Sequence, residues 1–198
     1  MKIAIYGGAF NPVHLGHVEI VEHLNNKTDF DKILIIPSKF SPHKSNENLV
    51  DDAHRFEMCK LAFEKFDKCE VSDIELKRDE ISYTINTLFQ LNETYCDDEL
   101  FLVCGSDMFL SLLNWRQPED ILKLVSIYAF VRDSEKEDIM LEQKHILENM
   151  GTKVEISKIK VSPFSSTEVR NAIKNSDDYS SFLSKEVYDY IIENNLYK

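Results

Sequence analysis

Short apolar runs recur along the chain, and most end at a glycine, a proline or a polar residue. Such runs, when turn-forming residues bound them, are typical of strands buried in a sheet. The first run ends at Gly7-Gly8, and the second is stopped by Pro37. The pattern predicts six strands, over Lys2–Tyr6, Lys32–Ile36, Cys69–Asp73, Leu100–Cys104, Ser126–Val131 and Lys153–Ser157.

Between these runs, apolar residues recur at helical spacing. One segment carries the apolar stripe of an amphipathic helix, formed by Phe56, Cys59, Ala62, Phe63 and Phe66. Another begins at a hydroxyl residue that is suited to cap a helix, and a long one is closed by a glycine. The pattern predicts helices over Leu15–Asn25, Asp52–Phe66, Ser82–Tyr95 (capped by Ser82 or Thr84), Met108–Leu113, Glu119–Leu124, Glu135–Met150 (closed by Gly151), Thr167–Lys174 and Lys185–Asn194.

The alternation of strands with helices favours βαβ units. It predicts an α/β fold whose sheet is mostly parallel and covered by helices on both faces. The length of 198 residues suits one α/β domain, or a nucleotide-binding domain with a small appendage. In such sheets, ligands bind outside the carboxyl ends of the strands. Three unusual segments follow strands there, after Tyr6, after Ile36 and after Cys104.

Charge and composition exclude several classes. A formal net charge of −12 argues against nonspecific binding to nucleic acid or to an anionic membrane, because both require a basic face. We find neither an apolar run that would span a bilayer nor a signal peptide, so we expect a cytoplasmic protein. The cysteines form no CxxC pair, and we expect reduced thiols in the core at Cys59, Cys69, Cys96 and Cys104.

The sequence GGAFNPVHLGH at residues 7–17 carries the first candidate chemistry. Its two leading glycines let the backbone approach a ligand closely, and the N-terminus of the following helix attracts anions. His14 and His17 share one face of that helix, and Gly16 between them leaves room for a ligand. Two imidazoles aimed at one spot can donate hydrogen bonds to a phosphate.

Three other interpretations of this segment were weighed. The glycines can form an ordinary turn beside incidental histidines. Zinc is disfavoured because a catalytic site needs a third ligand, which neither an HExxH motif nor a cysteine cluster supplies. Hydride transfer is disfavoured because the segment is not the GxGxxG of dehydrogenases.

A second segment, PFSSTEVR at residues 163–170, places hydroxyls before a helix. Arg170 follows Thr167 by one helical turn. Free N–H groups, hydroxyls and a guanidinium together can cradle a phosphate. The alternative is a plain capped helix that carries a surface arginine.

Three further segments offer ligand groups. The segment around the sequence PHK offers cations for a second phosphate, from Lys39, His43 and Lys44. The alternative is a simple solvated loop. Tyr83 and Thr84, within SYTINT, begin a helix, for which simple capping is the alternative. 

Gly105 and Asp107 follow a buried strand, where a carboxylate can accept hydrogen bonds from ribose hydroxyls. The only tryptophan, Trp115, can stack on a ring such as a pyridine, and core packing is its alternative.

The two phosphate-type segments resemble one known family. GGAFNPVHLGH is similar to the GxFxPxHxGH signature of the Rossmann-like nucleotidyltransferase superfamily, and PFSSTEVR is similar to its SSTxxR motif. The resemblance implies a doubly wound Rossmann-like sheet and a catalytic pair, with His17 acting on the α-phosphate of ATP and His14 assisting. It also implies that a C-terminal helical part, about residues 163–198, completes the ATP phosphate site of a single domain over residues 1–198. The implied ATP-binding residues are Gly7, Gly8, Ala9, Phe10, His14, His17, Gly105, Asp107, Ser165, Ser166, Thr167 and Arg170.

PHK, SYT and the GxD that precedes a tryptophan together resemble the bacterial nicotinate-nucleotide adenylyltransferases, over nearly the whole chain. That likeness implies that ATP, bound with Mg²⁺, reacts with nicotinate mononucleotide in NAD biosynthesis, with no protein ligand assigned to the metal. Asn86, Ala9 and Ser41 depart from the pattern, and the role of Asn86 stays open. The implied residues for nicotinate mononucleotide are Lys39, His43, Lys44, Tyr83, Thr84 and Trp115.

The rival interpretations keep the nucleotide site but change its use. Nicotinamide mononucleotide or phosphopantetheine can serve as the acceptor, although phosphopantetheine enzymes typically lack the PHK, SYT and tryptophan combination. A regulatory module that binds ATP without transferring it is disfavoured because His14, His17 and Arg170 are all intact. The sequence leaves a homo-oligomer open.

Overall fold

Six strands form one sheet in the computed structural model, which describes residues 1–40, 49–131, 136–159 and 161–198. The four central strands are apolar through most of their length, and the two edge strands include polar residues. Every strand pair among the described residues is parallel. The strands are β1 (Lys2–Gly8), β2 (Lys32–Pro37), β3 (Cys69–Val71), β4 (Glu99–Gly105), β5 (Ser126–Val131) and β6 (Val154–Lys158).

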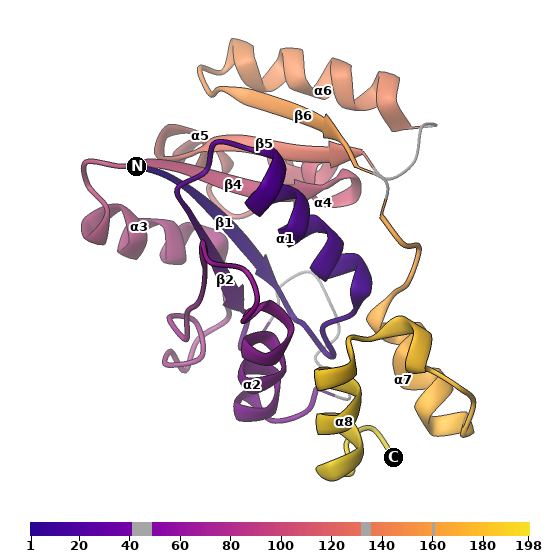
Figure 1. Ribbon diagram of the computed structural model, residues 1–198. Helices are drawn as coiled ribbons and strands as arrows, with labels where there is room; N and C mark the ends of the chain where they lie inside the picture. The colour runs from indigo at the N-terminus through magenta and orange to yellow at the C-terminus, as the bar shows by residue number, and fades with distance from the viewer. Residues whose placement is uncertain (41–48, 132–135, 160) are drawn as a thin grey trace.

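Helices connect the strands and cover both faces of the sheet (Figure 1). Single 3₁₀ turns at Leu112–Asn114 and Ser180–Phe182 accompany them. The α-helices are α1 (Leu15–Lys27), α2 (Asp52–Phe63), α3 (Thr84–Thr94), α4 (Ser106–Ser111), α5 (Pro118–Leu124), α6 (Glu137–Asn149), α7 (Ser166–Asn175) and α8 (Lys185–Glu193).

The strand order β3-β2-β1-β4-β5-β6 is that of a doubly wound Rossmann-like sheet. The predicted fold class is confirmed. The chain direction across the sheet reverses between β1 and β4, which are paired from Lys2↔Glu99 to Ile5↔Leu102. Since ligands of such sheets bind outside the carboxyl ends of the strands at this reversal, the segments after Gly8 and Gly105 occupy the expected place.

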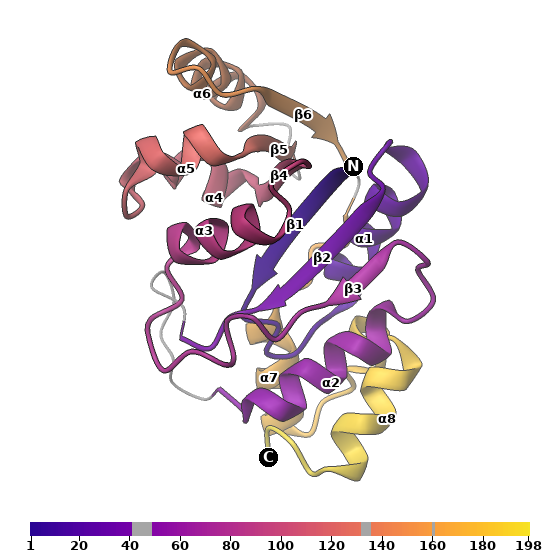
Figure 2. The same ribbon diagram turned by 90° about the vertical axis from the view of Figure 1, so that its left-hand side faces the viewer.

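Alternate side chains of β1 enter two different cores. Ala4 and Tyr6 pack with α1, α2, α7 and α8, whereas Ile3 and Ile5 pack with α3, α4, α5 and α6. Figure 2 shows these two groups of helices on opposite sides of the sheet. Burial on both faces explains why the four central strands β2, β1, β4 and β5 are largely apolar, whereas the edge strands β3 and β6 carry polar residues.

Several predicted boundaries differ from the structure. α2 ends at Phe63 although the apolar pattern continues to Phe66, because Phe66 packs into the core after the helix has ended. The helix predicted from Ser82 begins at Thr84, and its N-cap residue Tyr83 makes no side-chain capping bond. The N-cap position is therefore occupied by Tyr83, and not by Ser82 or Thr84 as predicted. Gly151 does close α6, with φ +95°.

The cysteines are free thiols, as expected, but they do not all lie in the core. Cys59 and Cys104 are buried, Cys69 is half-buried and Cys96 is exposed. Burial raises the pKa of the Cys104 thiol to about 12. Cys96 follows α3 in a turn, where no sheet or helix face covers it.

One charged side chain lies inside the core. Arg55 of α2 is 0% exposed, on the same face of the helix as Cys59. Its guanidinium donates to the carbonyl oxygens of Ala9 at 2.8 Å, Ser38 at 2.6 Å and Val50 at 3.3 Å. It also pairs with the Asp52 carboxylate. Arg55 therefore ties the segments that follow β1 and β2 to α2.

We predict that Arg55→Met lowers the free energy of unfolding by about 3 kcal/mol or more, because three carbonyl groups lose a charged donor in the interior. Urea unfolding followed by circular dichroism measures this loss. Lys60→Met removes a positive charge from an exposed position of the same helix and should change stability by about 0.5 kcal/mol or less. Equal effects of the two substitutions would contradict the assignment.

Candidate active site

The loop after β1 folds back over its own glycines. The Phe10 ring is 2% exposed, and a Cβ built at Gly8 would come within 3.1 Å of it. Phe10 has φ +46°, a left-handed conformation that reverses the chain at this point. Its ring thus belongs to the core beneath the loop, which leaves its main chain for any ligand contact.

His14 and His17 lie together at the start of α1, as the sequence predicts. Their ring centroids are 3.8 Å apart. The backbone N–H of His14 donates to Nδ1 of His17 at 3.2 Å. A ring nitrogen that accepts this bond carries no proton, so a neutral His17 keeps its proton on Nε2. His17 is half-buried and thus presents a hydrogen-bond donor at the carboxyl end of β1.

Gly16 has a role in packing. A Cβ at this position would lie 3.1 Å from the His14 ring and 3.1 Å from the carbonyl oxygen of Ser162. A side chain at this position would press on the protein itself, so the glycine is required for packing, and the prediction that it leaves room for a ligand stays a prediction. Gly16 lets the His14 ring and the chain before α7 approach α1 closely.

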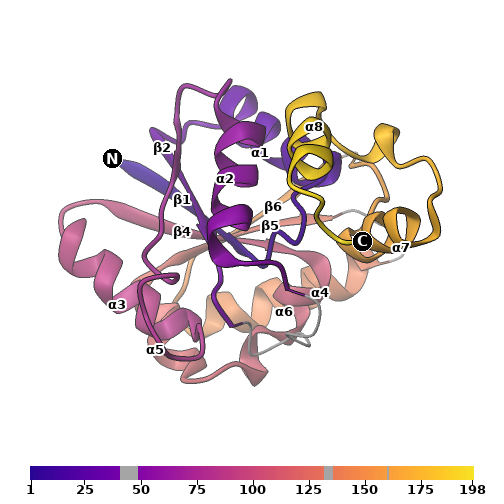
Figure 3. The same ribbon diagram turned by 90° about the horizontal axis from the view of Figure 1, so that it is seen from below.

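The first turn of α7 is anchored to the loop after β1. The Ser166 hydroxyl donates to the Pro12 carbonyl at 2.8 Å, and Arg170 donates to the Asn11 carbonyl at 2.7 Å. Arg170 also bonds the Thr167 hydroxyl at 3.1 Å. Two segments from opposite ends of the sequence are thereby brought together. Figure 3 shows α7 and α8 side by side in this C-terminal part of the chain.

Ser165 caps α7 through a reciprocal pair of bonds with Glu168. The Ser165 hydroxyl accepts from the Glu168 N–H at 3.2 Å, and the Glu168 carboxylate accepts from the Ser165 N–H at 2.8 Å. The Ser165 hydroxyl also donates to the Glu168 carboxylate at 2.7 Å, and this bond, with the bond from the Ser165 N–H and a smaller contribution from His14, holds the pKa of Glu168 below its usual value. The capped-helix interpretation and the phosphate-cradle interpretation of this segment are therefore compatible.

A further bond fixes the approach to α7. The Glu19 carboxylate of α1 accepts from the Ser162 N–H at 2.5 Å and from the Ser162 hydroxyl at 2.6 Å. Charge-assisted bonds of this kind are stronger than neutral ones. The chain before α7 is thus held against the helix that carries His14 and His17.

A second group of predicted residues gathers where β2 ends and α3 begins. The N–H of Lys39 donates to the Ser82 hydroxyl at 3.1 Å, and the Ser82 N–H donates to the Phe40 carbonyl at 2.9 Å. The Lys39 ammonium pairs with Asp79 at 2.6 Å. His43 and Lys44 were predicted beside Lys39, and they lie outside the described residues.

Tyr83 is joined to the segment that contains the tryptophan. The Arg116 guanidinium carbon lies 4.6 Å from the centroid of the Tyr83 ring, a cation–π contact. Trp115 is 8% exposed and belongs to the same hydrophobic core as the buried residues of α3. Its indole N–H donates to the Ser111 hydroxyl at 3.3 Å. Thr84, the first residue of α3, is half-buried. The geometry thus places Trp115 near Tyr83 by way of Arg116.

Asp107 lies in the first turn of α4, directly after β4. Its side chain is 85% exposed and its carboxylate pairs with Lys136 at 2.6 Å. Gly105 ends β4, where a Cβ would contact only the Phe130 ring at 3.5 Å. Both predicted residues therefore stand at the carboxyl end of the strand that neighbours β1.

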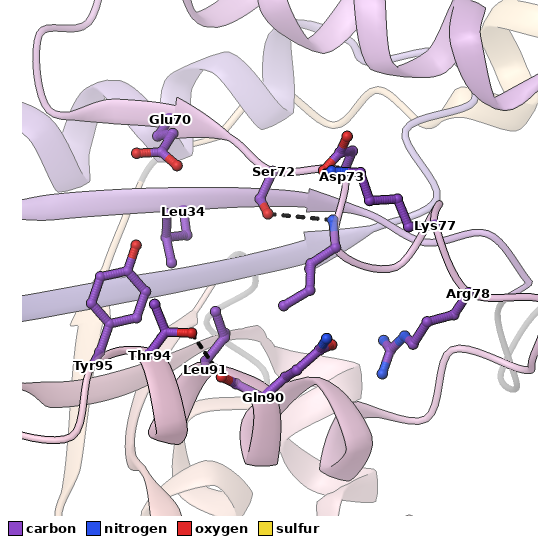
Figure 4. A pocket seen from close by; sticks show the side chains of 11 residues that line it. Leu34, Glu70, Ser72, Asp73, Lys77, Arg78, Gln90, Leu91, Thr94 and Tyr95 are labelled. Atoms are coloured by element: carbon purple, nitrogen blue, oxygen red, sulfur yellow. Dashed lines mark hydrogen bonds and ion pairs between the residues drawn. The ribbon is translucent and has the colours of Figure 1, made fainter.

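A pocket of about 430 Å³ lies elsewhere, between the chain after β3 and α3 (Figure 4). Its wall includes Leu34 and Leu91 below and the charged side chains of Glu70, Lys77 and Arg78 around them. All of its lining residues lie outside the predicted set. This hollow is therefore separate from the candidate site.

Three residues outside the predicted set, Arg55, Asn11 and Tyr197, hold the site together. Arg55 bonds the Ala9 and Ser38 carbonyls, and so links the segments after β1 and β2. The Asn11 side chain accepts from the Tyr197 hydroxyl at 2.9 Å. Burial raises the pKa of Tyr197, which keeps this donor protonated. The sequence did contain a signal for Arg55. It lies one helical turn before Cys59, so its charge falls on the apolar stripe of the predicted helix.

Within residues 1–40, 49–131, 136–159 and 161–198, no group of three or more histidine, cysteine, aspartate or glutamate side chains is placed to hold a metal ion. No helix in the described part of the chain is long and apolar enough to cross a bilayer.

The sequence matches a family model and many curated proteins. The cytidylyltransferase-like model matches residues 5–172. A protein of Fusobacterium nucleatum is 40% identical over 94% of this chain and 95% of its own length. One of Carboxydothermus hydrogenoformans is 36% identical over 100% of this chain and 98% of its own length. Both are named as probable nicotinate-nucleotide adenylyltransferases.

The fold is shared with solved structures. The Plasmodium falciparum nicotinic acid mononucleotide adenylyltransferase complexed with NaAD superposes with a TM-score of 0.82 at 22% identity, over 99% of this chain and 97% of that one. At this identity the likeness establishes the fold alone. The family follows from the two sequence matches, which cover 100% and 94% of this chain at 36% and 40% identity. The chain belongs to the cytidylyltransferase-like family and, within it, to the nicotinate-nucleotide adenylyltransferases.

Proposed function

We propose that the chain transfers the adenylyl group of ATP to nicotinate mononucleotide and forms nicotinate adenine dinucleotide and pyrophosphate, a step of NAD biosynthesis. Membership of the family carries this function. The observation that supports it in the structure is the pair His14 and His17, whose ring centroids lie 3.8 Å apart at the carboxyl end of β1. An oxygen of the mononucleotide 5′-phosphate attacks the α-phosphorus in line, and the bond from that phosphorus to the bridging oxygen of pyrophosphate breaks.

The reaction needs positioning and charge stabilisation rather than a side-chain nucleophile, because the attacking group is already a phosphate anion. We assign the principal catalytic contact to His17, whose Nε2 proton can bond the α-phosphate, and an assisting contact to His14. Gly7, Gly8, Ala9 and Phe10 offer main chain to ATP. Asp107, which follows Gly105, offers a carboxylate to a ribose.

The leaving pyrophosphate is assigned to the start of α7. Ser165, Ser166, Thr167 and Arg170 stand at this N-terminus, where free N–H groups and the helix dipole favour an anion. The bonds from Ser166 and Arg170 to the loop after β1 fix the distance from this end of α7 to the histidines. In this proposal the residues 163–198 complete the phosphate site of a single domain.

The acceptor half is assigned to the second group of residues. Lys39, together with His43 and Lys44, serves the mononucleotide phosphate, whereas Tyr83, Thr84 and Trp115 serve the nicotinate ring. Mg²⁺ enters as the magnesium complex of ATP, so it is part of the substrate. The cytoplasmic location stays a prediction.

The acceptor is tested by pyrophosphate release from Mg-ATP, with nicotinate mononucleotide, nicotinamide mononucleotide and phosphopantetheine compared at equal concentrations. We expect strong preference for the first. If another acceptor were preferred, the assignment of the ATP site would stand. The assignments of Lys39, Tyr83, Thr84 and Trp115 to nicotinate mononucleotide would be wrong. Release with none of them, despite ATP binding measured by calorimetry, would indicate a regulatory module.

We expect His17→Ala to lower kcat by about 10² or more, the scale for the loss of one preorganised donor to a developing charge. Steady-state pyrophosphate release measures the effect. His145→Ala, at an exposed position of α6, is the matched variant and should keep near-normal turnover. Near-normal turnover of the His17 variant would remove His17 from the mechanism.

For Trp115→Ala we expect the Kd of nicotinate mononucleotide to rise by about tenfold, which is on the order of one aromatic stacking interaction. The Kd of ATP should stay nearly unchanged, and Trp115→Phe should recover most of the affinity. Calorimetric titration with each nucleotide gives both constants. An equal loss for the two nucleotides would support the core-packing interpretation of Trp115.

A further inference from the structure

The side chain of Asn11 joins three segments beside the proposed phosphate site. It lies in the loop after β1 and is 4% exposed. Its Oδ1 accepts from the Tyr197 hydroxyl at 2.9 Å and from the Val50 N–H at 3.3 Å. An amide oxygen has two lone pairs, and these two bonds use both of them. One atom therefore ties the loop after β1 to the chain before α2 and to the chain after α8.

The main chain of Val50 is held from both sides. Its N–H donates to Asn11, and its carbonyl oxygen accepts from Nε of Arg55 at 3.3 Å. Arg55 also donates to the Ala9 carbonyl at 2.8 Å. These bonds and the main chain from Ala9 to Asn11 form a closed ring, in which the Asn11 side chain supplies one of the acceptors. A change in the orientation of that side chain would open the ring.

The main chain of Asn11 fixes a residue of the proposed pyrophosphate site. Its carbonyl oxygen accepts from Arg170 at 2.7 Å, and the next carbonyl, that of Pro12, accepts from the Ser166 hydroxyl at 2.8 Å. Arg170 carries the guanidinium that is assigned to the leaving pyrophosphate. The position of Asn11 therefore sets where Arg170 lies relative to His14, which follows three residues further along the chain.

Tyr197 reaches Asn11 because the chain after α8 turns back on itself. Asn195 and Tyr197 have φ of +52° and +66°, left-handed conformations that are uncommon for residues other than glycine. The Leu196 side chain between them is 8% exposed and packs into the core that contains α2 and α8. Figure 3 shows this segment, marked C, running from α8 toward α7. Core packing thus holds a strained backbone that directs the Tyr197 hydroxyl at Asn11.

We propose that Tyr197 is a positioning residue for the ATP half of the reaction. It acts through Asn11: its hydroxyl fixes the Asn11 side chain, and Asn11 fixes Arg170 and the loop that leads to His14. The identity of the reaction that gains from this arrangement rests on the proposed function. The fixing of Asn11 does not.

We expect Tyr197→Phe to raise KM for ATP by about fivefold, the scale of one neutral hydrogen bond, because the ring stays and only the hydroxyl is lost. KM for nicotinate mononucleotide should stay within about twofold of the wild type. Steady-state pyrophosphate release with each nucleotide varied in turn gives both values.

Tyr190→Phe is the matched control. The Tyr190 hydroxyl bonds Nδ1 of His54 at 2.9 Å, the length of the bond from Tyr197 to Asn11, but it joins α8 to α2. The control should leave both KM values unchanged. An effect on KM for ATP as large as that of Tyr197→Phe would reduce Tyr197 to a structural role and overturn the proposal.

Asn11→Ala removes the shared acceptor and should raise KM for ATP at least as much, again without a matching rise for nicotinate mononucleotide. In the double variant Asn11→Ala/Tyr197→Phe, loss of the hydroxyl should add nothing, because its partner is already gone. Additive effects would overturn the proposal, as would an equal rise in KM for the two nucleotides. Should Asn11→Ala fail to fold, Tyr197→Phe alone decides by the same split.

A measurement without substrate separates this inference from the proposed function. The Val50 N–H donates to the same oxygen of Asn11, so its amide hydrogen exchange in the full chain should be about fivefold faster in Tyr197→Phe than in the wild type or in Tyr190→Phe. If the wild type shows no turnover with nicotinate mononucleotide and Val50 still exchanges faster in the variant, the positioning stands and the proposed acceptor is wrong. Unchanged exchange at Val50 would overturn the positioning whatever the activity.

Discussion

The buried guanidinium of Arg55 is the interaction on which the geometry of the site depends. A charge that is 0% exposed is costly unless it is paired and hydrogen-bonded, and here the guanidinium bonds three main-chain carbonyls and one carboxylate. Two of those carbonyls, at Ala9 and Ser38, belong to the loops at the carboxyl ends of β1 and β2. One side chain therefore links the loops that follow β1 and β2. The free-energy cost of burying its charge is offset by these four bonds.

The topology of the sheet explains why the site forms at this place. β1 and β4 are neighbours at the reversal of the strand order, so loops from distant parts of the sequence leave the sheet side by side. α7 then reaches the same edge from the end of the chain, through the bonds of Ser166 and Arg170 to the loop after β1. The strand order thus brings these loops to one edge of the sheet. α7 places its N-terminus and the Arg170 guanidinium at the same edge.

Much of the fold and of the candidate site was predictable from the sequence. The remainder was not predictable, and the reasons are physical. β5 was predicted to the residue, and His14 and His17 were predicted to lie together, because periodicity and neighbouring positions are local properties. The end of α2 was misplaced because Phe66 is buried outside the helix as well. Arg55 was missed because its bond to Ala9 spans 46 positions, and Ser82 was taken for a cap because its partner Lys39 is 43 positions away.

The segments after β1 and before α3 are held by different kinds of bond. The loop after β1 is held through its carbonyl groups, by Arg55 at Ala9 and by Arg170 at Asn11. A carbonyl is present whatever the side chain, so the alanine at position 9 keeps its bond to Arg55. The segment before α3 is held through a side chain, because the Ser82 hydroxyl accepts from the Lys39 N–H and no apolar residue would supply that acceptor. A substitution at position 82 therefore removes a bond between two segments, whereas a substitution at position 9 leaves the bond from Arg55 in place.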